Sequence, residues 1–281
     1  MYQFLVIRIH EATSAFTIVA KQNSAGWQGN GMSKRIIILG TGATCVYCDF
    51  GWKDGKSDPD VEVYGVNGAY TIPKIMPPDI RNQFKMDKLF MTDYTWSDTG
   101  TLNFHPGEIN EFAKTYGTQI VSLHPHKIGK HVIKDTRYPW RRICHKFHNN
   151  YMTDTICYMI AYALDKYTVE AKNSNGVVRL ELTEPLTIAL YGVDMATTLE
   201  YYISKCGVEF WLGQAFALGC EITITNGSVI MMHPRGVMYG FRPKQDLSKI
   251  DFFGILRQEE EHHKLIPQGP RSGRRRMDLS S

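Results

Sequence analysis

The sequence predicts an α/β protein with a Rossmann-like, doubly wound and mainly parallel sheet that carries helices on both faces. Two observations lead to this prediction. Continuous aliphatic runs such as RIIILG (35–40) are typical of strands that are buried on both faces of a parallel sheet. These runs alternate along the chain with segments whose apolar residues recur at helical spacing, and such alternation favours βαβ units.

The expected elements follow in order from the first aliphatic run. Strands are expected at 34–40, 61–67, 87–93, 118–126, 185–195 and 220–226. Helices are expected at 108–116, 152–167 and 207–219. In the second of these helices Ile156 and Ile160 share a face, and Thr153 and Asp154 are suited to cap its amino terminus. The KNSNG stretch (172–176) predicts the turn of an inserted hairpin.

The chain is expected to form one domain with extensions at both ends. Residues 32–256 are expected to form a nucleotide-binding domain with a basic insertion at 124–150. Residues 1–31 are expected to be an N-terminal extension outside the core, because MSKRIIILG from Met32 is typical of a chain whose first strand follows at once. Residues 257–281 have little apolar content and include the basic run Arg274-Arg275-Arg276, which predicts a disordered basic tail.

Composition and charge limit the function classes. With 43% hydrophobic and 21% charged residues, the chain resembles an ordinary globular protein, and no apolar stretch reaches the roughly 18 residues that a membrane span needs. Six scattered cysteines predict reduced thiols in a cytoplasmic protein. The net charge is only +4, yet segment 124–148 holds seven Lys or Arg against one Asp. That segment is expected to attract phosphate, including that of nucleic acid.

Two short motifs could indicate metal, but neither predicts a metal site. The sequence Asp58-Pro59-Asp60 precedes a strand and is typical of a turn. Cys45 and Cys48 have the C-x-x-C spacing, but no second pair stands at the distance of a zinc site. We expect these two cysteines to be buried thiols, and we expect no structural metal.

Glycines and polar residues gather where the predicted strands end. Because loops after parallel strands meet on one rim of the sheet, we expect a ligand there. The residues on this rim are Gly40, Thr41, Gly42, Asn67, Gly68, Thr92, Asp93, His124, His126 and Asp194. Glycines let a backbone approach a ligand closely, and the amide groups of a following helix suit phosphate. A nucleotide is expected, and NAD is disfavoured because the second strand ends in Asn67 instead of an acidic residue.

Four stretches together resemble a known superfamily: IIILGTGAT, YGVNGAY, MTDTICYMIAYAL and IALYGVDM. They are similar to motifs of bacterial CMP-sialic acid-dependent sialyltransferases, and of the related motility accessory factors and pterin-diphosphokinase-like proteins. Uncharacterised phage and metagenomic proteins carry similar patterns. The likeness spans about residues 34–230. It implies a Rossmann-like fold and metal-independent transfer from a nucleotide-sugar donor, with no cofactor and with an acceptor that the sequence does not specify.

The resemblance also implies which residues surround the nucleotide. They are the loop Gly40, Thr41, Gly42, Ala43 and Thr44, together with Asn67, Thr153 and Thr155. Asp194 matches an acidic position after a core strand, although a strand-end carboxylate that caps a helix fits it equally. Asp93 completes the expected nucleotide contacts as a strand-end carboxylate.

Catalysis by the sialyltransferase route needs a histidine base ahead of the helix at 207–219, and this chain has none there. Glu200 is the candidate base instead, with His124 and His126 as rivals. Tyr201, Tyr202 and Lys205 are candidates for binding the departing phosphate. Arg141 and Arg142, in the basic segment, are candidates for binding phosphate or the acceptor.

Two other functions stay open. A magnesium-dependent, diphosphokinase-like phosphotransferase would use aspartates such as Asp93 or Asp194. A non-enzymatic protein would bind a nucleotide, or would bind nucleic acid through Lys127 to Lys146. Magnesium dependence distinguishes the first of these, and a steep salt dependence distinguishes nucleic-acid binding.

Overall fold

The computed structural model describes residues 4–10, 15–21, 33–53, 55–94, 104–128, 131–172, 174–195 and 199–231. The predicted tail at 257–281 lies outside the described residues.

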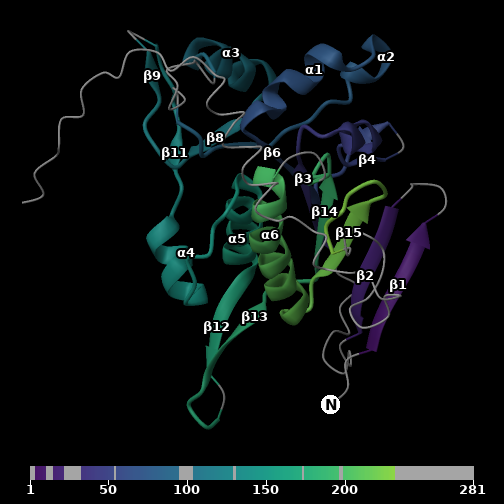
Figure 1. The fold of residues 1–281 in the computed structure, drawn as a ribbon, viewed down its shortest axis with the longest axis vertical. Helices are drawn as coiled ribbons and strands as arrows, with labels where there is room; N and C mark the ends of the chain where they lie inside the picture. The colour runs from purple at the N-terminus through teal and green to yellow at the C-terminus, as the bar shows by residue number, and fades with distance from the viewer. Residues whose placement is uncertain are drawn as a thin grey trace, which may run out of the picture.

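The centre of the fold is a parallel sheet of seven of the described strands. In chain order they are β3 (Lys34–Leu39), β6 (Val61–Val66), β7 (Lys88–Met91), β8 (Gln119–Ser122), β11 (Thr136–Arg137), β14 (Leu186–Tyr191) and β15 (Glu221–Thr225). Across the sheet they lie in the order β15-β14-β3-β6-β7-β8-β11. The chain therefore builds outward from β3 in one direction and then returns to place β14 on the other side of β3 (Figure 1). The switch point of the fold lies between β3 and β14.

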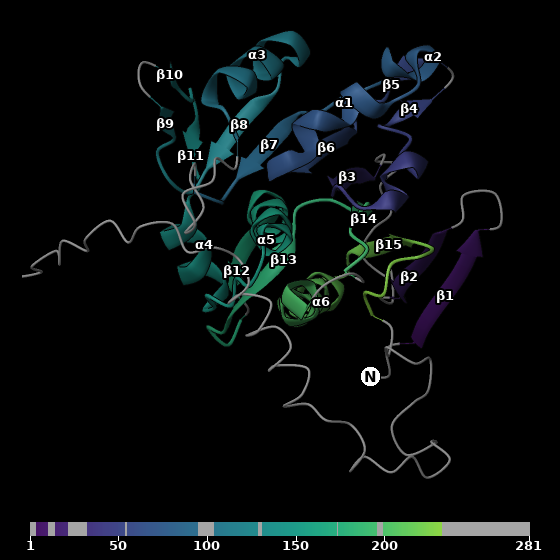
Figure 2. The same ribbon diagram turned by 45° about the horizontal axis from the view of Figure 1, so that its top comes forward.

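Helices cover both faces of this sheet, as predicted. Successive strand residues point to opposite faces. On one face Ile36 and Ile38 join a core with α5 (Thr155–Tyr167) and α6 (Leu199–Ala217), whereas Ile37 and Leu39 join a second core on the other face. That second core includes α1 (Ile72–Ile75) and α3 (Pro106–Tyr116), and the two helix layers are separated by the sheet in Figure 2. The protein has an α/β, Rossmann-like fold.

The remaining elements are short and connect or flank the central sheet. They are η1 (Ala43–Tyr47), β4 (Trp52–Lys53), β5 (Lys56–Ser57), η2 (Asn67–Thr71), α2 (Pro78–Arg81), β9 (Lys127–Ile128), β10 (His131–Val132), α4 (Trp140–Phe147), β12 (Thr168–Lys172) and β13 (Val178–Leu182). Strands β12 and β13 pair in an antiparallel hairpin, which confirms the prediction from the KNSNG stretch. None of the helices in the described ranges combines the length and the apolar character needed to cross a bilayer.

Three sequence expectations differ from the structure. Strands β1 (Phe4–His10) and β2 (Ala15–Lys21) belong to the sheet, because β2 pairs antiparallel with β15 and so covers what would be an open edge. The expected basic insertion is also part of the fold, since β11 pairs in parallel with β8 and Ile143 of α4 is buried in the core. The helix expected at 207–219 begins at Leu199, about two turns earlier.

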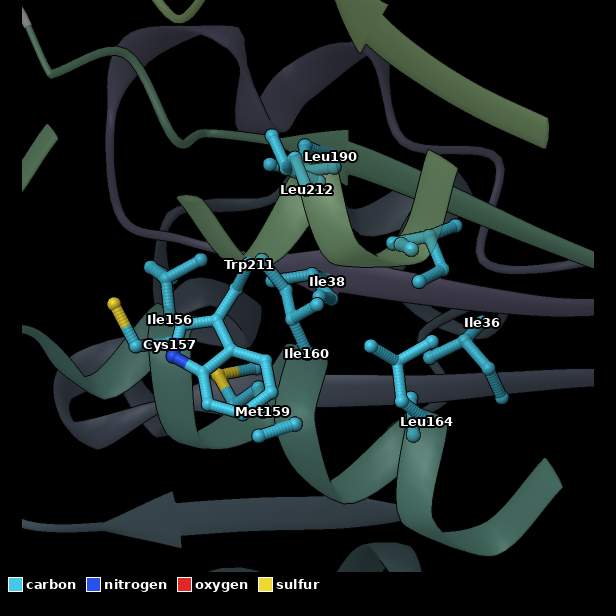
Figure 3. Close-up of a cluster of buried hydrophobic side chains, with 14 of the residues drawn as sticks. Ile36, Ile38, Ile156, Cys157, Met159, Ile160, Leu164, Leu190, Trp211 and Leu212 are labelled. Atoms are coloured by element: carbon cyan, nitrogen blue, oxygen red, sulfur yellow. The ribbon is translucent and has the colours of Figure 1, made fainter. Parts of the chain in front are cut away.

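Helix α6 is held against its neighbours by Trp211. The indole is fully buried, meets the ring of Phe147 edge-on at 5.4 Å, and donates from Nε1 to the carbonyl oxygen of Tyr151 at 2.8 Å. Figure 3 shows Trp211 in one cluster with α5 side chains that include Met159 and Ile160. This contact fixes α6 beside α5, and both helices border the site described below.

We predict that Trp211→Ala lowers the free energy of unfolding by about 3–5 kcal/mol, because it leaves a cavity in the core and an unpaired carbonyl at Tyr151. Urea denaturation measures the change. Trp140→Ala is the matched control, since that side chain is 50% exposed and its loss should cost about 0.5 kcal/mol or less. Equal costs for the two substitutions would contradict the packing of α6.

Candidate functional site

A cleft of about 680 Å³ lies at the carboxyl edge of the parallel sheet. The loops after β3, β6, β7, β8 and β14 and the amino terminus of α5 form its walls. Nine of the ten predicted nucleotide contacts line it, namely Gly40, Thr41, Gly42, Ala43, Asn67, Asp93, Thr153, Thr155 and Asp194. Open α/β sheets bind ligands at this edge and near the switch point, so the cleft is the candidate site.

The glycine loop after β3 is bonded directly to the loop after β14. The N–H of Gly40 donates to Tyr191 O and the N–H of Gly42 donates to Gly192 O, both at 2.8 Å. A Cβ atom on Gly40 would clash with the carbonyl oxygen of Gly192. Gly192 itself has a φ of +66°, which favours glycine. These glycines are therefore required for the contact between two loops, in addition to any contact with a ligand.

Thr44 and Asp194 add side-chain hydrogen bonds to this contact between the two loops. Thr44 is the predicted nucleotide residue that does not line the cleft, because it is buried beneath the glycine loop. Its hydroxyl donates to the Asp194 carboxylate and accepts the N–H of Gly192 at 2.9 Å. The backbone N–H of Thr44 also donates to Asp194, at 3.3 Å. We call the set Gly40, Gly42, Thr44, Gly192 and Asp194 the loop lock.

Asn67 connects three segments on the opposite wall. Its Nδ2 donates to the Asp93 carboxylate at 2.6 Å and to the Thr155 hydroxyl at 3.1 Å. Its Oδ1 accepts the backbone N–H of Thr92 at 3.0 Å, and the hydroxyls of Thr92 and Thr155 lie 2.5 Å apart. One amide thus ties the end of β6 to the end of β7 and to α5, and it presents the exposed carboxylate of Asp93 at the rim.

The amino terminus of α5 borders the cleft, but the protein has already capped it. Asp154 accepts the N–H of Ile156 at 2.7 Å, and a carboxylate at this position offsets the positive end of the helix dipole. The Thr153 hydroxyl donates to the carbonyl oxygen of Ser204 in α6 at 3.0 Å. It fits there because Gly207 has no Cβ. A phosphate at this helix end would therefore compete with Asp154.

The loop after β3 offers better anion donors. No partner is found within the described part of the chain for the N–H of Thr41, nor for that of Ala43, the first residue of η1. The segment that follows this loop is η1, a 3₁₀ turn of five residues. Carboxylates of Asp93, Asp154 and Asp194 line the cleft, and none of its described lining residues is Lys or Arg. Anion binding would thus depend on backbone amides.

The two histidines named as rival bases do not line the cleft. His126 is buried, meets the Phe104 ring edge-on at 5.0 Å, and has Nε2 3.5 Å from Met91 O. Burial lowers its pKa. The His124 ring stacks on Tyr94 instead, and burial together with Arg137 lowers its pKa.

The other predicted side chains lie on α6 and α4. Lys205 is buried and forms an ion pair with Glu209 at 3.4 Å. Arg142 pairs with Asp165, and Arg141 lies over the ring of Trp140. None of these basic residues lines the cleft. Glu200, Tyr201 and Tyr202 belong to the first turn of α6, and their side chains lie outside the described residues.

Sequence reasoning missed several lining residues. Asp154 was expected as a cap and is also a cleft carboxylate, whereas Tyr158 and Ser204 were not singled out. Tyr158 lies three residues after Thr155, so helical spacing from that threonine could have identified it. Ser204 could not have been found this way, because the start of α6 was placed too late.

The two motifs considered for metal have structural roles. Asp58 Oδ1 accepts the N–H of Asp60 at 2.8 Å, which confirms the predicted turn. Cys45 and Cys48 are buried as predicted, and burial raises the pKa of Cys48 to about 12. The described residues contain no group of three or more His, Cys, Asp or Glu side chains that could hold a metal ion.

No protein-family model, curated protein or solved structure matches the chain. Function is therefore inferred from the cleft itself.

We predict that Gly40→Ala destabilises the protein by about 1–3 kcal/mol, because the added methyl group is forced against the backbone of Gly192. Thermal and urea unfolding measure the loss. Gly68→Ala is the matched control at the same cleft, since its Cβ would lie 3.6 Å from Thr41 and meet only ordinary van der Waals contact. A tolerated Gly40→Ala would show that the loop lock has room to relax.

Proposed function

We propose that the cleft binds the nucleotide part of a nucleotide-sugar donor, and that the protein is a glycosyltransferase-like enzyme that acts without a metal cofactor. One observation carries the proposal. The glycine loop after β3, Asn67 after β6 and Asp93 after β7 follow one another along a single cleft beside the switch point. This succession offers backbone N–H donors, then an amide, then a carboxylate, which matches the phosphate and hydroxyl groups of a nucleotide.

The phosphate belongs at the loop after β3. The N–H groups of Thr41 and Ala43 are the donors, because consecutive backbone amides in a tight turn form an anion-binding concavity. The ribose then lies beside Asn67 and Asp93, where the Asp93 carboxylate and the remaining lone pair of Asn67 Oδ1 can accept hydrogen bonds from its hydroxyls. The sugar of the donor extends from the phosphate toward Asp194 and Ser204, which line the cleft at its other end beside β14 and α6.

Glu200 remains the proposed base. It lies in α6 one helical turn before Ser204, which lines the cleft. The acceptor hydroxyl loses its proton to Glu200 while its oxygen bonds to the anomeric carbon of the donor. The bond from that carbon to the phosphate oxygen breaks, and the electron pair leaves with the nucleotide. Tyr201 and Tyr202, in the same turn, are the proposed donors to the departing phosphate.

The charge of the cleft favours a second candidate. Three carboxylates and no Lys or Arg among the described lining residues repel a phosphate that arrives alone. A magnesium-dependent phosphotransferase would bring Mg²⁺ with its nucleotide and hold the ion with one or two carboxylates, such as Asp93 or Asp194. The cation would have to arrive with the ligand, because no preformed cluster of three ligands exists in the described ranges.

Binding of nucleic acid through the basic segment has weaker support. Arg142 and Lys146 both contact the buried Asp165, so two of the cations have structural partners. A cytoplasmic location is also part of the proposal, and it is supported by six cysteines that form no disulfide.

A thermal-shift panel of CMP, UMP, GDP, AMP, ATP, NAD and CMP-sialic acid, each with and without Mg²⁺, tests the function. We expect a metal-independent rise in Tm with CMP or another nucleoside phosphate, because a ligand that binds only the folded state stabilises it by an amount that grows with the logarithm of its concentration above Kd. A rise that requires Mg²⁺ would favour the phosphotransferase. No rise with any nucleotide would overturn both candidates.

We predict that Asn67→Asp raises the nucleotide Kd about tenfold or more, because it removes two hydrogen bonds and places a carboxylate against Asp93. Isothermal titration calorimetry measures the change. Asn110→Asp is the control, since Asn110 donates to Val132 O and accepts from Lys134 N in a similar way but does not line the cleft. An unchanged Kd for Asn67→Asp would remove Asn67 from the site.

A further inference from the structure

Two aromatic rings stack on each other beside the cleft, and each directly follows a residue that lines it. Tyr94 follows Asp93 after β7, and His124 follows Leu123 after β8. Their ring centroids are 4.3 Å apart and their planes are inclined by only 14°. The imidazole therefore covers one face of the phenol ring, while Tyr94 as a whole is 63% exposed.

This arrangement differs from the aromatic packing elsewhere in the described chain. The other ring pairs there meet at 41° or more, and most lie in the cores, as with Tyr64 and Phe90 at 44°. A parallel pair at the surface leaves a flat ring face that a second planar group can cover. An exposed ring held rigid in this way loses little conformational entropy when a ligand stacks on it.

The imidazole of this ring pair is uncharged at neutral pH, because burial and the nearby Arg137 lower the pKa of His124. A neutral imidazole stacked on an aromatic ring suits the π-face of a nucleobase, whereas it offers no charge to attract a phosphate. This separates the ring pair chemically from the glycine loop.

The order of strands places Tyr94 and His124 at the end of the cleft where the base of the proposed nucleotide would lie. Strands β3, β6, β7 and β8 are consecutive neighbours in the sheet, and neighbouring strands lie about 4.8 Å apart. The end of β7 is thus about 10 Å from the end of β3. With the phosphate at the loop after β3 and the ribose beside Asn67, the base of the same ligand extends toward β7 and β8. Asp93 and Leu123, the chain neighbours of the two rings, both line the cleft.

We propose that Tyr94, supported from behind by His124, is the stacking platform for the nucleobase of the bound nucleotide. The inference rests on the proposed function and adds to it the position and orientation of the base. It assigns His124 a supporting role in place of the role of a base in catalysis.

Calorimetric titration of the full chain with two ligands tests the platform. The ligands are CMP, or whichever nucleotide of the panel binds tightest, and ribose 5-phosphate, which lacks the base. Tyr94→Ala should weaken nucleotide binding about tenfold or more, as expected for one lost base-to-ring stack, and should leave ribose 5-phosphate within about twofold. Tyr94→Phe keeps the ring and should bind the nucleotide like the wild type. His124→Ala should cause a smaller loss than Tyr94→Ala.

Trp140→Ala, which removes an exposed ring outside the cleft, is the control and should leave both affinities unchanged. Nucleotide binding by Tyr94→Ala equal to that of the wild type would overturn the platform. Equal losses for the nucleotide and for ribose 5-phosphate would also overturn it, because they would show a general effect on the rim. Failure of the wild type to bind any nucleotide would instead overturn the proposed function.

Discussion

The contact between the loops after β3 and β14 is the constraint on which the site depends. In an open α/β sheet these loops diverge at the switch point and leave a crevice between them. Here the loop lock ties the two loops together, because Gly40 and Gly192 touch through their backbones and Thr44 bonds to Asp194. The cleft is lined by both of these loops and extends toward the residues that follow β6 and β7 and toward the amino terminus of α5.

The carboxylates of the cleft already have hydrogen-bond partners within the protein, and this limits what the cleft can bind. Asp194 is engaged by Thr44, and Asp154 satisfies the end of α5. Both of these carboxylates are thus used for structure, and the groups left to bind an anion are backbone N–H groups of the glycine loop. A site of this kind favours a ligand with few negative charges and many neutral contacts. A nucleoside monophosphate ester meets that description better than a free triphosphate does.

The sequence was sufficient for six of the seven parallel strands, although not for β11 or for the antiparallel β1 and β2. The continuous burial of Ile36 to Leu39 illustrates the signal that identified those six strands. The cap at Asp154 and the gathering of strand-end residues were also predictable, since parallel strands bring their ends together. The direction in which a side chain points after the end of a strand was not predictable from the sequence. His124 and His126 follow the same strand, yet the first stacks on Tyr94 and the second is buried against Phe104. Nor could the sequence show that the glycines serve a second loop, because Gly192 lies about 150 residues away.

That separation has a consequence for how the protein acquires its site. Thr44 and Asp194 are 150 positions apart, and β14 comes later in the sequence than β6, β7, β8 and β11, which lie on the other side of β3. Contacts of such long range are formed late and slowly in folding, because a long loop must close first. A chain with only its first half folded would have β3 and its glycines, but it would lack Gly192 and Asp194, to which Gly42 and Thr44 are hydrogen-bonded. The cleft proposed for the nucleotide is therefore complete only once β14 has returned to pair with β3.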